Sequence, residues 1–143
     1  MADRDRPRLM FHGAVVLFVG LLCGYPTVVE SGGDEGVRLW HTAHEALIMM
    51  GIWILTLSSV LPALVLQKRE ATGLVWSMLV MGYGFMLALV IGGITGVSSF
   101  SPGQTATSYL AFTGSAFGIL GALLATLLTM TGARAAMRGV RGE

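Results

Sequence analysis

Residues 74–97 read LVWSMLVMGYGFMLALVIGGITGV and contain no charged side chain. A helix needs about 20 apolar residues to cross the roughly 30 Å hydrocarbon core of a bilayer, and this stretch is long enough. Three further stretches of the same kind lie at about 9–29, 39–66 and 109–131. Each predicts a transmembrane helix, because backbone polar groups inside lipid must be satisfied within the segment. We therefore expect an all-α fold, an integral membrane four-helix bundle.

The composition of the whole chain agrees with a membrane protein. Of its 143 residues, 54% are hydrophobic and 12% are charged, whereas a soluble domain carries about 25% charged residues. The mean hydropathy is +0.73. A net charge of +1 leaves no basic excess for binding nucleic acid. Without an internal repeat or a separate soluble domain, residues 1–143 are predicted to form a single membrane domain whose partner is the lipid bilayer.

The links and their charges predict the topology. Short links make successive helices antiparallel neighbours, which indicates an up-down bundle. With four crossings, eight cations fall on one side of the membrane: Arg4, Arg6, Arg8, Lys68, Arg69, Arg134, Arg138 and Arg141. Only Arg38 falls on the other side. The positive-inside rule therefore predicts a multi-pass protein of the cell membrane with both termini in the cytoplasm.

Few polar side chains lie inside the predicted spans. Lys, Arg and Asp are absent from all four, which disfavours a proton pump or an ion-coupled transporter. His41 and His44, three residues apart, share a face near the outer end of the second span. Gly51 lies two turns below His44.

An imidazole above a glycine notch can hold a flat ligand against the helix backbone. Haem is such a ligand, and histidine is its common axial partner. His44 and Gly51 are therefore candidate cofactor-binding residues, and His44 is the candidate iron ligand. Two plainer interpretations stay open. His44 would then be an interfacial side chain bonded to water or a headgroup, and Gly51 a helix-packing residue.

The other ionisable groups give weaker signals. His41-x-x-His44-Glu45 is not the H-E-x-x-H zinc pattern, and no Cys or Asp stands nearby to complete four ligands. We expect His12 to be a snorkelling residue at the cytoplasmic interface. Glu45 is expected at the aqueous edge or against a neighbouring subunit's histidine. Cys23, the only cysteine, is expected to be a buried inert thiol.

Small residues at four-residue spacing predict close helix packing. They form three runs: Gly20-x-x-x-Gly24, Gly92-x-x-x-Gly96, and Gly114-x-x-x-Gly118-x-x-x-Ala122. The spacing leaves open whether the partner helix belongs to the same subunit. Five methionines are expected to fill the core: Met49, Met50, Met78, Met81 and Met86.

From Phe11 onward the chain resembles the styrene oxide isomerase family. The resemblance rests on the order and spacing of several features: His12-Gly13 at the start of the first span, Trp40 followed by His44, Gly51 seven residues later, Pro62 eleven beyond, and Ser99-Phe100-Ser101-Pro102 after the third span. The length of the chain and the four-helix layout agree with the family as well.

The resemblance implies a cofactor, an assembly and a reaction. Members of the family form homotrimers with haem b at the subunit interfaces, and the histidine matching His44 is the axial ligand of the iron. Ferric iron acts as a Lewis acid on an epoxide oxygen and yields an aldehyde, so the substrate would be a small hydrophobic epoxide. The protein's partners would then be its own copies, the bilayer and this substrate.

The sequence departs from the family at two positions. The family's catalytic asparagine falls on Met50, and its catalytic tyrosine falls on Leu89. Tyr83 lies about two turns earlier and is not an obvious substitute. No catalytic residue is therefore assigned, and we expect weak or altered isomerase activity. The alternatives that stay open are a haem protein for gas binding or electron transfer, and a haem-free membrane scaffold subunit.

Overall fold

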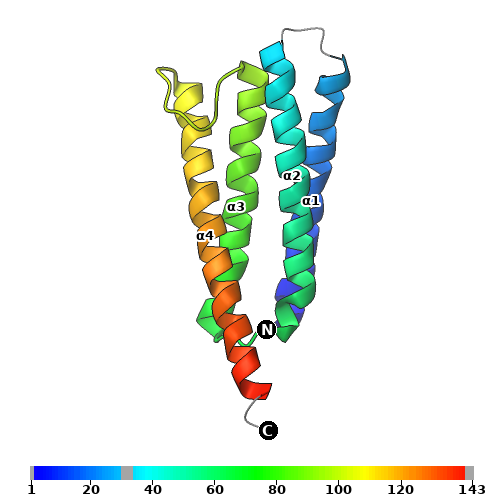
Figure 1. Ribbon diagram of the computed structural model, residues 1–143, viewed down its shortest axis with the longest axis vertical. Helices are drawn as coiled ribbons and strands as arrows, with labels where there is room; N and C mark the ends of the chain where they lie inside the picture. The colour runs from blue at the N-terminus through cyan, green and yellow to red at the C-terminus, as the bar shows by residue number, and fades with distance from the viewer. Residues whose placement is uncertain (1, 30–33, 141–143) are drawn as a thin grey trace.

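The structure is a computed structural model that describes residues 2–29 and 34–140 (Figure 1). Its elements are α1 (Ala2–Val29), α2 (Asp34–Val60), the short 3-10 helix η1 (Leu61–Ala63), α3 (Lys68–Thr95) and α4 (Ala106–Val140). Each of the four α-helices contains a segment that is long and apolar enough to cross a membrane. The predicted all-α four-helix membrane architecture is confirmed, and the chain is a multi-pass membrane protein.

The helices alternate in direction, so α1 begins and α4 ends at the same end of the bundle (Figure 1). The basic residues Arg6, Arg8, Lys68, Arg69, Arg134 and Arg138 lie at or near that end. Arg38 lies near the start of α2, at the opposite end. Arg141 and part of the link between the first two helices lie outside the described residues. The charge asymmetry that underlies the predicted topology is thus present in the fold.

The observed helix ends differ from the sequence prediction where local chemistry overrides hydropathy. The second span is not one α-helix to residue 66: α2 ends at Val60 and η1 follows, with Pro62, which lacks a backbone N–H and disfavours the α conformation of the residue before it, in its first turn. The third helix begins at Lys68 rather than 74. There the backbone N–H of Gln67 donates to Glu70 Oε2 at 2.7 Å, as part of a capping box.

The fourth helix also exceeds the apolar stretch from which it was predicted. It runs from Ala106 to Val140, well past residue 131, and α1 likewise begins at Ala2 instead of residue 9. Hydropathy marks only the part of a helix that lies in lipid, whereas the helical backbone continues into the polar end regions. The stretches 9–29 and 109–131 were predicted as the membrane-crossing parts, and α1 and α4 extend beyond them as helices.

Glycine faces join the helices into two hairpins within one chain. A Cβ on Gly20 would lie 2.8 Å from the backbone N of Ile48, so α1 and α2 touch backbone to backbone. A Cβ on Gly114 would lie 2.8 Å from the carbonyl oxygen of Gly84, which joins α3 and α4 in the same way. The spacing left open which subunit these faces contact. For the runs that begin at Gly20 and Gly114, the partner helix is in the same chain.

Gly96 has a different role from the one its spacing predicted. It caps α3 at its C-terminus with φ of 69°, and a Cβ there would meet nothing within 4 Å. The expected close-packing face at Gly92 and Gly96 is therefore wrong for Gly96, because the left-handed cap conformation, not helix contact, accounts for this glycine.

The core lies mainly around α3, which contacts the other three helices. Met78 and Met81 are fully buried in it, and Met50 and Met86 pack against it. Met49 is 67% exposed, so its predicted core position is wrong; it faces outward from α2. Cys23 is buried, as expected.

Candidate functional site

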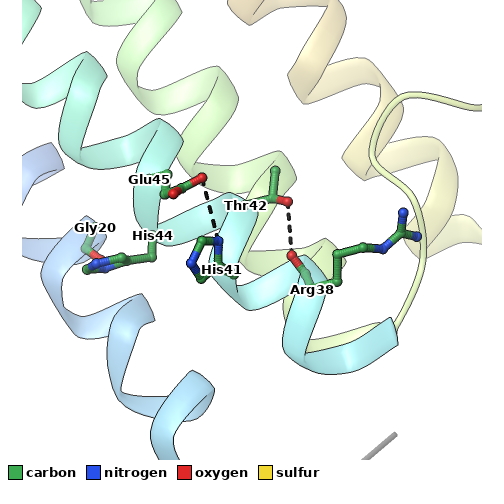
Figure 2. Close-up of polar contacts among 6 residues, drawn as sticks. All are labelled: Gly20, Arg38, His41, Thr42, His44 and Glu45. Atoms are coloured by element: carbon green, nitrogen blue, oxygen red, sulfur yellow. Dashed lines mark hydrogen bonds and ion pairs between the residues drawn. The ribbon is translucent and has the colours of Figure 1, made fainter. Parts of the chain in front are cut away.

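His44 is held by a hydrogen bond to the neighbouring helix. Its Nδ1 lies 2.8 Å from the carbonyl oxygen of Gly20 in α1 (Figure 2). Because a carbonyl oxygen only accepts, Nδ1 carries the proton and donates it. In a neutral imidazole the other nitrogen, Nε2, then keeps its lone pair, which is the form that binds a metal.

Gly24 makes room for the His44 ring. A Cβ on Gly24 would lie 2.8 Å from both Cε1 and Nδ1 of His44. The ring therefore rests directly against the α1 backbone between Gly20 and Gly24, and it is half-buried there. The run Gly20-x-x-x-Gly24, whose spacing predicts only a packing face, also holds the His44 ring. The sequence carries one signal for this contact: the glycine run is on α1, and the next helix, which packs against it, contains His44.

Gly51 lies where α2 packs closely against α1. A Cβ on Gly51 would lie 2.7 Å from the backbone of Leu17, and Gly51 is buried. The predicted notch below His44 is therefore filled by α1 of the same chain. Of the two interpretations of Gly51, a notch for a flat ligand or a helix-packing residue, the second accounts for this contact.

His41 and Glu45 turn away from His44 and pair with each other (Figure 2). His41 Nδ1 lies 3.5 Å from Glu45 Oε2, and the two side chains are 59% and 66% exposed. His41 and His44, about one turn apart on α2, thus lie in different environments. His44 is fixed between helices, whereas His41 belongs to an exposed pair whose electrostatic contribution is small. Glu45 lies at an exposed edge, as one of the two interpretations expected.

His12 has a protein partner that the sequence did not suggest. Its Nδ1 and the hydroxyl oxygen of Tyr83 share a hydrogen bond of 2.6 Å, and the two rings meet edge to face with centroids 5.6 Å apart. The predicted snorkelling role is therefore wrong: the half-buried imidazole points to α3 instead of the interface. Tyr83 is engaged at this contact with α1, about two turns before Leu89 on α3.

Leu89 lies beside the face of α2 that carries Thr42, whereas His44 contacts α1. It is 5% exposed and borders a cavity of about 210 Å³ between α2 and the link from α3 to α4. Thr42, Ser98 and Ser99 also line this cavity. Met50 packs half-buried against the core. The structure thus brings neither Met50 nor Leu89 into a hydrogen-bonding role, since both side chains are apolar.

A haem iron needs fewer protein ligands than a zinc site. In the ranges 2–29 and 34–140 no three His, Cys, Asp or Glu side chains gather as a metal-binding group. A single imidazole with a free Nε2 suffices for an iron that a porphyrin already holds by four nitrogens. The donor set around His44 is therefore of the kind that suits haem.

Comparison with known proteins gives the family. The search of curated proteins found no match. The family model described as styrene oxide isomerase matches residues 5–134, which is most of the chain. The chain belongs to the styrene oxide isomerase family, as the resemblance predicted.

Proposed function

We propose that this protein binds haem b through His44 Nε2 and is an isomerase-type member of its family. The observation that carries the proposal is the hydrogen bond from His44 Nδ1 to the Gly20 carbonyl. Histidines that bind metals usually donate their second N–H to a carbonyl or carboxylate, which fixes the tautomer and raises the basicity of the bound nitrogen.

The surroundings of His44 fit a cofactor at the edge of the subunit. The ring is half-buried, with one side against α1. Both helices beside it, α1 and α2, contain apolar segments long enough to cross a membrane. When bound, ferric haem supplies a Lewis acid for an epoxide oxygen. The chain's own part is to present one oriented nitrogen and an apolar environment for a small hydrophobic epoxide.

Two substitutions limit the activity that we propose. Met50 and Leu89 stand where the family has polar side chains, and neither donates a hydrogen bond. Loss of one group that stabilises developing charge typically costs about 10²–10³ in rate. We therefore propose weak or altered epoxide isomerisation rather than a fast enzyme.

The assembly that we propose is a homotrimer with the cofactor between subunits. Gly20, Gly24 and Gly114 are used for contacts within the chain, so the glycine runs give little support to this assembly. The support comes from the resemblance and from the half-exposed His44, whose open side needs a second wall around a flat ligand. We further propose that both termini face the cytoplasm, because the cations gather at that end of the bundle.

The absorption spectrum of the detergent-purified full-length protein tests the cofactor. We expect a Soret band and a pyridine haemochrome of the b type, with native mass spectrometry showing haem on trimers. Protein that purifies folded without haem, and takes up none from added hemin, would contradict the proposal and favour a haem-free scaffold. Haem retained on dissociated monomers would contradict the shared interface only.

A further inference from the structure

Three features follow one another where α1 meets α3. Nearest the basic end, the guanidinium carbon of Arg8 lies 5.1 Å from the centroid of the Trp76 ring. One turn further along α1 is the hydrogen bond between His12 and Tyr83. Beyond it a groove of about 430 Å³ is lined by Val19, Tyr83, Met86, Leu87, Val90 and Ile91. We call this run of contacts the α1–α3 seam.

The spacing of the residues places them on one face of each helix. Trp76, Tyr83 and Val90 are seven residues apart on α3, so they follow one stripe. With a rise of 1.5 Å per residue, the stripe from Trp76 to Val90 covers about 21 Å. The hydrocarbon core of a bilayer is roughly 30 Å thick, so the seam spans somewhat more than one leaflet.

The end of the seam at Arg8 suits an anionic group. Arg8 is exposed and its guanidinium lies over the ring of Trp76, which is itself 54% exposed. A guanidinium held over an aromatic ring by a cation–π contact has five N–H donors, and such donors suit a phosphate. Cations outnumber acids among the described side chains at the starts of α1 and α3: Arg6, Arg8, Lys68 and Arg69 against Asp5 and Glu70. Glu70 is moreover engaged in the cap of α3.

The other end of the seam suits a hydrocarbon chain. Apart from the Tyr83 ring, its lining consists of aliphatic side chains and one methionine, which adapts readily to irregular shapes. Among the described side chains beside the groove, His12 and Tyr83 carry polar atoms, and His12 Nδ1 and the Tyr83 hydroxyl form a hydrogen bond with each other. This hydrogen bond lowers the free-energy cost of placing an acyl chain beside the two side chains.

We propose that the α1–α3 seam binds one anionic phospholipid of the membrane, with its phosphate at Arg8 and one acyl chain in the groove. From the basic end inward, the seam presents the charge of Arg8, then the His12–Tyr83 pair, then the apolar groove. A phospholipid of that leaflet presents its headgroup, ester region and acyl chain in the same order. The site is separate from His44, whose contacts are with Gly20 and Gly24 on another face of α1. It therefore needs no cofactor.

Native mass spectrometry of the detergent-purified full-length protein tests the headgroup. Phosphatidylglycerol and phosphatidylcholine with the same acyl chains are added in equal amounts. We expect several-fold greater retention of phosphatidylglycerol by the wild type. Arg8→Gln should abolish this preference, and Arg69→Gln, at the same end of the bundle but outside the seam, should keep it. Equal retention of the two lipids by the wild type would overturn the proposal, as would equal effects of the two substitutions.

A second pair of variants tests the chain. Leu87→Trp adds bulk to the groove at a 45% exposed position, and Leu120→Trp does so at a 61% exposed position on α4. We expect Leu87→Trp to lower retention of both lipids several-fold and Leu120→Trp to leave it unchanged. Glycerol phosphate, which has the headgroup without the chain, should not displace the bound lipid. Unchanged retention in Leu87→Trp, with helicity intact by circular dichroism, or displacement by glycerol phosphate would overturn the acyl-chain assignment.

Discussion

His44 Nδ1 donates a hydrogen bond to the carbonyl oxygen of Gly20, 2.8 Å away on the preceding helix. The bond joins the candidate iron ligand on α2 to the backbone of α1, so the orientation of the imidazole depends on how the two helices pack. Gly20 and Gly24 permit this packing because a side chain at either position would collide with α2. Helix association and ligand geometry are therefore one structural feature in this protein.

Replacing His44 should remove the cofactor. We expect His44→Ala to lose most of the Soret absorbance, because the imidazole is the proposed bond between protein and iron. His41→Ala is the matched control: it removes an imidazole one turn away that is exposed and paired with Glu45. Absorbance per mole of folded protein, after size-exclusion chromatography, is the measurement.

His12→Ala serves as a second control. It breaks the contact with Tyr83 and should leave the Soret band in place, because that contact lies on α3 and not beside His44. Normal haem content in His44→Ala together with empty His12→Ala would show that the wrong histidine has been chosen.

Gly24→Ala should weaken haem binding without unfolding the protein. The added Cβ would lie 2.8 Å from the His44 ring, which is the end of a flexible side chain and can move away. Moving it sacrifices the hydrogen bond to Gly20, and changes to such supporting contacts typically reduce metal affinity about 10–100-fold.

Hemin titration of the apoprotein measures this effect. Gly73→Ala is the control, because its Cβ would make only an ordinary contact of 3.5 Å with Leu128. If Gly24→Ala and Gly73→Ala bound hemin equally well, the ring would not depend on the α1 backbone for its position.

The fold could be predicted from hydropathy because lipid imposes a simple rule on each crossing segment. Each of the four apolar stretches corresponds to one α-helix of the structure, and the helix ends differ from the ends of the stretches. Pro62 and the capping box at Gln67 and Glu70 decide those ends by local backbone chemistry. Hydropathy does not report such effects, although both signals can be found in the sequence by looking for caps and prolines.

The candidate site could be predicted only in part. His44 stood out as a polar residue in an apolar helix, whereas its partner Gly20 is 24 positions away and contributes a backbone oxygen. Every residue has such an oxygen, so no residue type marks this partner. For Gly51 the pattern was ambiguous, since a glycine notch suits a flat ligand and a packed helix equally, and Leu17 fills it here.

Gly114→Ala should destabilise the hairpin of α3 and α4. Its Cβ would lie 2.8 Å from the carbonyl oxygen of Gly84, and a backbone atom inside a helix cannot move aside cheaply. Overpacking of this kind typically costs about 1–3 kcal/mol. Thermal unfolding in detergent, followed by circular dichroism, should show a lower midpoint than the wild type.

The control for this substitution is Gly139→Ala in the last turn of the same helix. A Cβ there meets nothing within 4 Å, and alanine has the higher helix propensity. Its midpoint should therefore equal or slightly exceed that of the wild type. A midpoint for Gly114→Ala as high as that of Gly139→Ala would show that the two helices do not depend on this close approach.

Restoring polar side chains should raise the epoxide isomerase activity. We expect the wild type to convert styrene oxide to phenylacetaldehyde slowly or not at all, because Met50 and Leu89 lack hydrogen-bond donors. Leu89 borders a cavity of about 210 Å³ that Thr42, Ser98 and Ser99 also line, so a tyrosine there has both space and polar neighbours for its hydroxyl.

The double variant Met50→Asn with Leu89→Tyr should therefore form aldehyde faster than the wild type. The expected increase in rate is up to about 10²–10³-fold, which is the typical contribution of one such group. Aldehyde formation is measured with oxidised and with dithionite-reduced protein at equal haem content, because ferrous iron is the poorer Lewis acid. Leu89→Phe combined with Met50→Leu is the control, since it changes size at the same positions without adding a donor. Fast turnover by the wild type would show that other residues have taken over the roles of the missing pair. Equal rates for the polar and apolar double variants would show that hydrogen bonding at these two positions does not limit the reaction.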